Sequence, residues 1–306
     1  MIWKLVGVLF VVLLLMFPVF ILYSNFTAES VEFRMNDVSG ETGGVISYVD
    51  VPVFSENLRF NHKDISYFID AGCKGVRRKA MIKAFEIFEE KMDLISFYEI
   101  GGSADIDVEC SEGFQISESL FAAGEGGPSR IINTSFFKTI EKGNIFLYED
   151  PMCDYPIVEL HELGHVFGFD HSEDPLNTMY NTTNCKQRIS EDMVRMIDDL
   201  YSVEALADAS ISELSAVKTG RYLDFNITVL NEGLVGIDAI SLTIYGDGEK
   251  ITTMEFGEID IGYGRTLRAS NVKLGFGSIE NIDFVVDSEN KVRELNEGNN
   301  FVRMTT

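Results

Sequence analysis

The sequence is short of positive charge. Its 306 residues include 25 Lys and Arg against 49 Asp and Glu, which gives a formal net charge of −24. Nucleic acids and anionic membrane surfaces bind proteins through basic faces, so this composition argues against either as the main partner. The acidic residues are spread along the chain, which indicates a strongly charged, soluble surface, with Ca²⁺ binding as an alternative.

Cysteine is also scarce, with four residues in the whole chain. None of them forms a C-x-x-C pair, which weakens a cysteine–zinc or thioredoxin-like interpretation. In an oxidising exterior an even count favours disulfides, and three connectivities exist. We prefer Cys73–Cys110 with Cys153–Cys185, because each pair brackets a compact run of sequence. Four buried free thiols are the alternative.

One apolar run, residues 2–23, is long enough to cross a bilayer as a helix. It lacks a convincing signal-peptide cleavage site, since Phe26-Thr27-Ala28 has a bulky residue at the wrong position. Lys4 lies at the start of the run and the next basic residue is Arg34, so the positive-inside rule places the N-terminus in the cytoplasm. We expect a single-pass cell-membrane anchor over 1–23, a stalk or linker over 24–44, and an extracellular remainder. Secretion after cleavage is the alternative.

The middle of the chain, residues 45–203, mixes strand and helix patterns. Helical spacing of apolar residues predicts helices over 76–94, 156–169 and 190–201, the last with Ser190 as its N-cap. Alternating or apolar runs predict strands over 65–70, 95–100, 104–110 and 144–148. The mixture indicates an α+β domain with one sheet and about three helices.

From 204 to 306 the pattern changes to short strand-like runs separated by glycine-containing turns. They lie at 223–231, 239–246, 250–256, 265–274, 281–287 and 300–304. This spacing is typical of an all-β sandwich, so we place a domain boundary near 203–210.

Histidine is as scarce as cysteine, and three of the four histidines fall in one motif, residues 161–171, which reads HELGHVFGFDH. His161 and His165 are four residues apart on a predicted helix, so both imidazoles can reach one metal ion. Gly168 allows the chain to leave the helix sharply and to return His171 as a third ligand. Three protein ligands leave a fourth position open, as a catalytic zinc site requires. Glu162 can hold a water molecule beside the metal.

This motif matches the metzincin pattern H-E-x-x-H-x-x-G-x-x-H at every fixed position. Met179, in the run Leu176-Asn177-Thr178-Met179-Tyr180, resembles the methionine that these enzymes carry in a turn beneath the metal. The run ADIDVEC (104–110) and the run LFAAGEGGP (120–128) are similar to strands of the matrixin branch. The resemblance implies a twisted mixed sheet with about three helices, one catalytic Zn²⁺ ion, Glu162 as general base, and a protein or peptide substrate.

The sequence departs from the matrixin pattern in two places. No cysteine precedes Cys73, and Cys73 lacks the Pro-Arg-Cys-Gly context of the inhibitory propeptide switch. No proline follows Tyr180, so the wall of the specificity pocket cannot be inferred, and Tyr180 is not counted as a ligand. The fourth histidine, His62, is far from the motif and is interpreted as structural.

The C-terminal region resembles a CARDB-type domain, an Ig-like β-sandwich of microbial surface proteins. The resemblance rests on NITVLNEG (226–233), IYGDGEKI (244–251) and above all VVDSENKVRELNEGNN (285–300). It implies a surface partner for residues 204–306, and a Ca²⁺ site there is a minority interpretation. Asn25, Asn133, Asn181 and Asn226 open N-x-[ST] sequons that mark candidate surface glycans.

Together these patterns predict a membrane-anchored, outward-facing zinc endopeptidase. The rival hypotheses are a surface adhesion or binding protein with a non-catalytic zinc site, and a metallohydrolase acting on a non-peptide amide.

Overall fold

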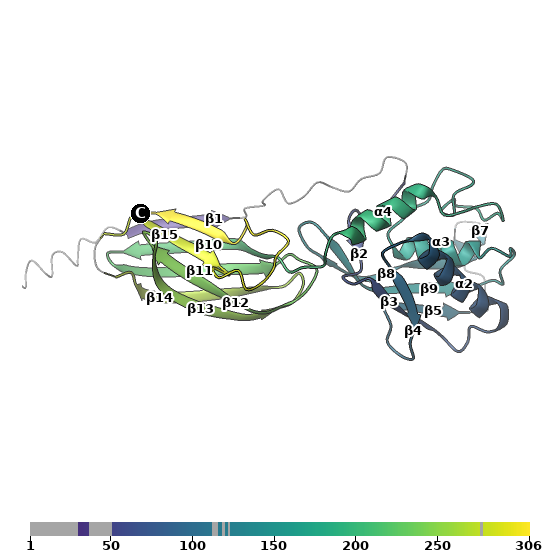
Figure 1. Cartoon of the computed structure of the whole chain (residues 1–306), viewed down its shortest axis with the longest axis horizontal. Helices are drawn as coiled ribbons and strands as arrows, with labels where there is room; N and C mark the ends of the chain where they lie inside the picture. Colours follow the sequence, from purple (N-terminus) through teal and green to yellow (C-terminus); the bar gives the residue numbers. More distant parts are fainter. Residues whose placement is uncertain (1–29, 37–50, 112–115, 118–119, 122, 276–277) are drawn as a thin grey trace, which may run out of the picture.

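The computed structural model describes residues 30–36, 51–111, 116–117, 120–121, 123–275 and 278–306. The predicted anchor over 1–23 lies outside these residues, as does most of the predicted stalk. Among the residues that are described, no helix is long and apolar enough to span a membrane. Figure 1 shows two lobes, one of mixed helices and strands and the other built of strands alone.

The mixed lobe is built on a six-stranded sheet. Its strands are β2 (Leu58–Arg59), β3 (Asp64–Ile69), β4 (Ser96–Glu99), β5 (Ile106–Cys110), β8 (Gly124–Asn133) and β9 (Lys138–Leu147). The order β2-β9-β5-β3-β4 is parallel throughout, and β8 is antiparallel to β9. A separate pair, β6 (Ile116–Ser117) and β7 (Leu120–Phe121), lies outside this sheet. The predicted mixed sheet is therefore confirmed.

Three helices are described in this lobe, as predicted: α2 (Gly75–Lys91), α3 (Ile157–Val166) and α4 (Glu191–Ser202). Ser190 caps α4, because its hydroxyl oxygen accepts the backbone N–H of Met193 at 3.3 Å. The helices and the sheet enclose one apolar core in which the rings of Phe88 and Phe167 stack with centroids 5.1 Å apart. The α+β fold class is confirmed.

A fully buried arginine holds the end of α4. Arg59 donates through Nη1 to the carbonyl oxygens of Leu200 at 2.5 Å and Val203 at 2.8 Å, and its guanidinium lies 4.4 Å from the centre of the Tyr201 ring. The last carbonyls of a helix have no partner within the helix, and a cation also suits the negative end of the helix dipole. Arg59 thus fixes the point where the chain leaves the mixed lobe.

Both preferred disulfides are present. Cys73 is bonded to Cys110, which ties the start of α2 to the end of β5, and Cys153 is bonded to Cys185. No cysteine is free, so the alternative of four thiols is wrong. The second bridge closes a loop that contains all of α3 and Met179.

The second lobe is a sandwich of two four-stranded antiparallel sheets. One has the order β1-β10-β11-β14 and the other β13-β12-β15-β16. The strands are β1 (Ser30–Asn36), β10 (Ala209–Thr219), β11 (Tyr222–Asn231), β12 (Ile237–Gly246), β13 (Glu249–Ile259), β14 (Gly264–Lys273), β15 (Asn281–Val286) and β16 (Phe301–Thr305). Alternate residues from both sheets fill its core, so the predicted all-β sandwich is confirmed.

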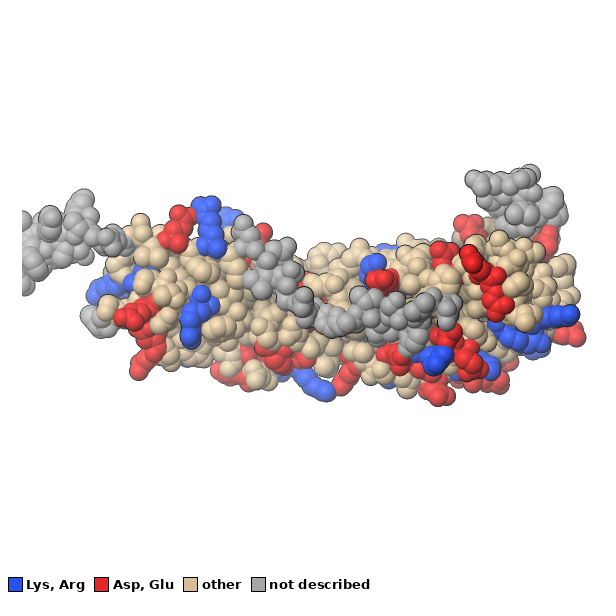
Figure 2. Space-filling model, turned by 90° about the horizontal axis from the view of Figure 1, so that it is seen from above, with Lys and Arg blue, Asp and Glu red and all other residues tan. Residues whose placement is uncertain are grey.

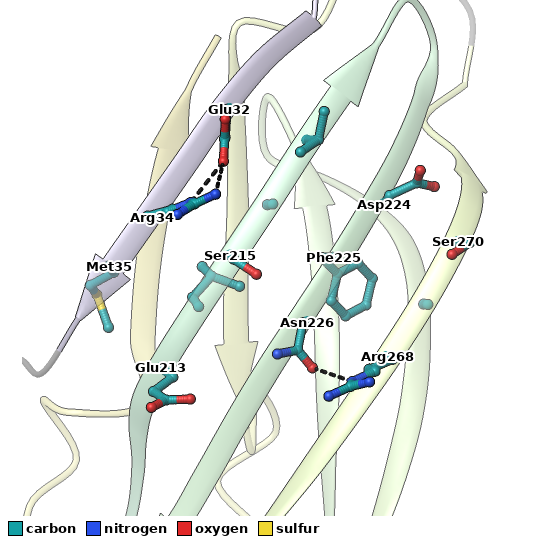
Figure 3. A pocket seen from close by; sticks show the side chains of 14 residues that line it. Glu32, Arg34, Met35, Glu213, Ser215, Asp224, Phe225, Asn226, Arg268 and Ser270 are labelled. Atoms are coloured by element: carbon teal, nitrogen blue, oxygen red, sulfur yellow. Dashed lines mark hydrogen bonds and ion pairs between the residues drawn. The ribbon is translucent and has the colours of Figure 1, made fainter.

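β1 corrects the expected stalk over 24–44. Its seven residues pair antiparallel with β10, from Ser30 opposite Thr219 to Asn36 opposite Glu213. Val31, Phe33 and Met35 pack on the sandwich core. The side chains of Glu32 and Arg34 point outward and form an ion pair (Figure 3). A segment that precedes the mixed lobe in sequence therefore completes the C-terminal domain.

The two lobes are in contact. Leu234, from the sandwich side, is buried in the core of the mixed lobe. Ser135 hydrogen-bonds Glu232, and Gly262 lies so close to the side chain of Ile132 that a Cβ on Gly262 would collide with it. These contacts place the β8–β9 turn against the loops that follow β11 and β13.

Candidate metal centre

Two histidines one helical turn apart on α3 face the same point. The Nδ1 atoms of His161 and His165 hydrogen-bond to the carbonyl oxygens of Thr178 and Phe169, both at 2.8 Å. Because each Nδ1–H donates to a backbone carbonyl, each Nε2 is left as the free lone-pair donor. The two Nε2 atoms lie 3.0 Å apart, which is close enough for both to bind one ion.

The third histidine returns to these two after a sharp turn. Gly168 has a φ of 93°, a left-handed value that favours glycine, and a Cβ there would also contact Leu58 at 2.9 Å. The ring of His171 lies with its centroid 5.2 Å from that of His161 and 4.9 Å from that of His165. One ligand atom from each of the three histidines lies within 4.8 Å of the other two.

The environment keeps the two helical imidazoles neutral. Burial lowers the pKa of His161 to about 4, with a further contribution from His165, and burial also lowers the pKa of His165. A neutral imidazole is the form that binds a metal. Three convergent nitrogen ligands, two of them oriented by backbone carbonyls, fit a tetrahedral Zn²⁺ ion with one open position.

Met179 lies directly beneath the histidines, as the motif predicts. Its side chain is buried and packs against Gly164, which lies on α3 between the two helical ligands. The turn that carries it is closed by two hydrogen bonds to Asn177: the Met179 N–H donates to Oδ1 at 2.8 Å and the Tyr180 N–H to the carbonyl oxygen at 3.1 Å. Met179 thus supports the site rather than contributing a ligand.

Glu162 lies beside the triad in a nearly dry position. It is 6% exposed, and burial together with the nearby Glu125 and Glu159 raises its pKa to about 8. The backbone N–H of Gly126 opposes this shift by hydrogen bonding to the carboxylate. A cation held by the histidines would favour the ionised form. Burial therefore favours the protonated carboxyl group and a bound cation would favour the ionised one, so the group can exchange a proton.

Two glycines of β8 allow this strand to pack closely against the part of α3 that carries Glu162. A Cβ on Gly124 would lie 2.9 Å from Glu162 Oε1, and one on Gly126 would collide with the backbone of Glu162. A larger residue at either position would push the strand away from the helix. The run LFAAGEGGP was singled out by its resemblance to a cleft-edge strand, but the need for glycine at these two positions was not predicted.

Two further residues near Glu162 were missed by sequence reasoning. Tyr148 donates its hydroxyl to Glu125 Oε2 at 3.0 Å, and burial with this hydrogen bond raises the pKa of Tyr148 to about 12. No local pattern joins a tyrosine at the end of β9 to a glutamate on β8, because only the antiparallel pairing brings them together. His62 lies elsewhere and bonds Asp105 through Nε2 at 3.1 Å, in agreement with a structural role.

The mixed lobe thus brings three histidines together next to a glutamate: His161, Glu162 and His165 lie on α3, and His171 follows that helix. Residues 59–202 match the family model described as Matrixin, and residues 199–304 match the model described as CARDB. The chain thus joins a matrixin-like domain to a CARDB-like domain.

Individual relatives are more distant. Stromelysin-2 of Rattus norvegicus is 25% identical over 190 residues, which cover 58% of this chain and 39% of that protein. The chain therefore spans well under two thirds of this relative. A solved CARDB domain of the PF1109 protein from Pyrococcus furiosus, in complex with di-metal ions, is 20% identical, covers 33% of this chain and 93% of its own, and has a TM-score of 0.26.

Proposed function

We propose that the protein is a membrane-anchored, outward-facing zinc endopeptidase. The observation that carries the proposal is the convergence of His161, His165 and His171 beside the buried Glu162. An ion held by these three histidines would polarise a scissile carbonyl and lower the pKa of a water molecule. Three ligands rather than four favour catalysis over a closed structural site.

Glu162 supplies the acid–base chemistry. Its carboxylate accepts the proton of the attacking water and later delivers it to the leaving amine. Burial raises the pKa of this carboxyl group, and an ion held by the histidines would lower it again, so the group can both accept and deliver a proton. Gly126 holds the carboxylate through its N–H, and the glycines of β8 allow the strand to lie against the helix at this point.

The substrate binds as an extended peptide along β8. Among the described strands β8 pairs only with β9, so its other edge can accept a peptide strand outside the Gly126 N–H, which is held by Glu162. Main-chain pairing of this kind recognises a peptide with little dependence on its side chains. The CARDB domain then offers a separate surface for a partner.

The peptidase proposal is tested on the full chain in detergent. We expect about one equivalent of zinc and hydrolysis of an unstructured protein, abolished by a chelator and restored by added zinc. Hydrolysis that a chelator leaves unchanged would contradict the proposal, as would zinc-loaded protein that cleaves nothing.

Membrane attachment is tested separately by washing native membranes with carbonate. An integral protein stays in the pellet. Recovery in the wash with an N-terminus that begins after residue 24 would show secretion instead.

A further inference from the structure

β1 places the two ends of the described chain at one end of the sandwich. Ser30 is paired with Thr219, and Lys218 Nζ donates to the side-chain hydroxyl of Thr306 at 3.0 Å. This outer end consists of the β10–β11 turn, the β12–β13 turn and the last residues of β14 and β16. It is opposite to the end that contacts the mixed lobe, where Glu232 meets Ser135 (Figure 1).

The apolar run over 2–23 is joined to Ser30 by a short stretch of chain. Seven residue steps separate Tyr23 from Ser30, and a fully extended chain covers at most about 25 Å over that length. If residues 2–23 span a bilayer, the outer end of the sandwich must lie close to its surface. A free stalk over 24–44, by contrast, would have allowed the mixed lobe to lie there.

The charge of the outer end differs from that of the chain as a whole. Its basic residues are Lys218, Arg221, Lys250, Lys273 and Arg303, and its acidic residues are Asp247, Glu249, Glu280 and Asp283. Basic residues thus outnumber acidic ones here, whereas the chain has twice as many acids as bases. Figure 2 shows basic side chains near the sandwich's outer end, on the left, with acidic ones among them, and further basic side chains on the mixed lobe.

An aromatic residue accompanies these basic side chains. Tyr222 is 41% exposed, and the guanidinium of Arg221 lies 5.6 Å from the centre of its ring. Tyrosine and basic side chains are the residues that suit the headgroup layer of a membrane. The acidic remainder of the protein would be repelled by an anionic surface.

We infer that the outer end of the CARDB sandwich faces the lipid surface, and that the sandwich is a spacer holding the active site away from the bilayer. Ten residue steps of β10 separate Thr219 from Ala209 beside the mixed lobe, about 33 Å at the rise of a β-strand. The protease therefore acts on substrates that stand out from the membrane. This inference rests on the membrane attachment proposed above but not on peptidase activity.

The experiment measures height above the bilayer. The full chain is reconstituted into vesicles of phosphatidylcholine with phosphatidylserine and an acceptor dye on the headgroups. A donor dye is placed at one of three exposed positions in turn, Lys250→Cys, Tyr263→Cys or Tyr98→Cys, which lie at the outer end, at the lobe junction and on β4. Energy transfer should fall in that order, at least several-fold from Lys250 to Tyr98. A flat or reversed order overturns the inference.

Three further readouts separate the causes of failure. Protein that does not float with the vesicles refutes membrane attachment, whereas protein that floats with a flat order refutes only the spacer.

Phe33→Asp removes an apolar anchor of β1 and should flatten the order, while the outward Arg34→Asp should not. The pair Arg34→Cys and Ser215→Cys, opposite each other on neighbouring strands (Figure 3), should form a disulfide that keeps the order. The pair Arg34→Cys and Arg268→Cys, on strands that are not neighbours, should form none. If neither pair forms a bond, β1 does not pair with β10 and the inference falls.

Discussion

The side chain of Met179 occupies the space that a Cβ on Gly164 would need. Gly164 lies between the two ligand histidines on α3, so the methionine turn and the metal-binding helix touch without any intervening side chain. His161 also bonds the carbonyl of Thr178, the residue before Met179. The turn therefore determines how closely α3 packs against it, and it orients the imidazole of His161.

Gly164→Ala should damage the site through this contact. The added methyl group must displace Met179, and overpacking of a dense core costs about 1–3 kcal/mol. We expect zinc affinity to fall by roughly 10–100-fold, as for the loss of other groups that orient metal ligands. Zinc affinity by competition with a chromogenic chelator gives the measurement. Gly101→Ala is the control, because a Cβ there meets nothing within 4 Å. Equal zinc affinities in the two variants would refute the supporting role of Met179.

The Cys153–Cys185 disulfide should stabilise the protein and the site together. Its ends are 32 residues apart, and closing a loop of this length contributes about 3–4 kcal/mol by restricting the unfolded chain. The double variant Cys153→Ala/Cys185→Ala should lose about this much stability in urea and bind zinc more weakly.

The other disulfide serves as the matched control. Cys73 and Cys110 are 37 residues apart, so Cys73→Ala/Cys110→Ala should lose similar stability. Its loop contains none of the histidines, so the folded protein should keep its zinc affinity. Identical zinc binding in both double variants would show that the loop around α3 does not need its bridge.

The stability of the sandwich should decline as the pH rises. Burial, together with Glu297, raises the pKa of Glu294 to about 8, and burial raises that of Asp208 to about 6. An acid whose pKa is higher in the folded than in the unfolded chain stabilises the fold below its ordinary pKa, and this contribution is lost as the pH rises through the folded value. Between pH 5 and pH 9 we expect the free energy of unfolding to fall by at least about 1 kcal/mol. Each unit by which the pKa of the folded protein exceeds that of the unfolded chain corresponds to about 1.4 kcal/mol.

Glu294→Gln should reduce this dependence on pH. Glutamine cannot ionise, so the variant should lose most of the slope between pH 6 and pH 9 while Asp208 retains its smaller part at lower pH. Thermal melts of parent and variant at several pH values provide the comparison. Parallel curves for the two proteins would mean that Glu294 is not the titrating group.

The convergence of the three histidines was predictable from sequence because its parts are local. Helical geometry alone brings His161 and His165 together, and Gly168 explains the return of His171. β1 was missed although Val31, Phe33 and Met35 alternate as a strand should. Its partner β10 lies more than 170 residues away in the chain, and no local period identifies a strand that joins a distant domain. The surroundings of Glu162 were missed for the same reason, since Tyr148 and Glu125 meet only through the pairing of β8 with β9.

The most direct test of the central claim separates proton transfer from metal binding. Glu162→Gln keeps the shape of the side chain but cannot accept a proton, and His171→Ala removes a ligand. We expect Glu162→Gln to retain about one equivalent of zinc after dialysis while hydrolysis of an unstructured protein falls by a factor of about 10²–10⁴. His171→Ala should instead lose zinc, and its activity with it. If Glu162→Gln cleaves as fast as the parent, or if His171→Ala holds zinc as tightly, the proposed site is wrong.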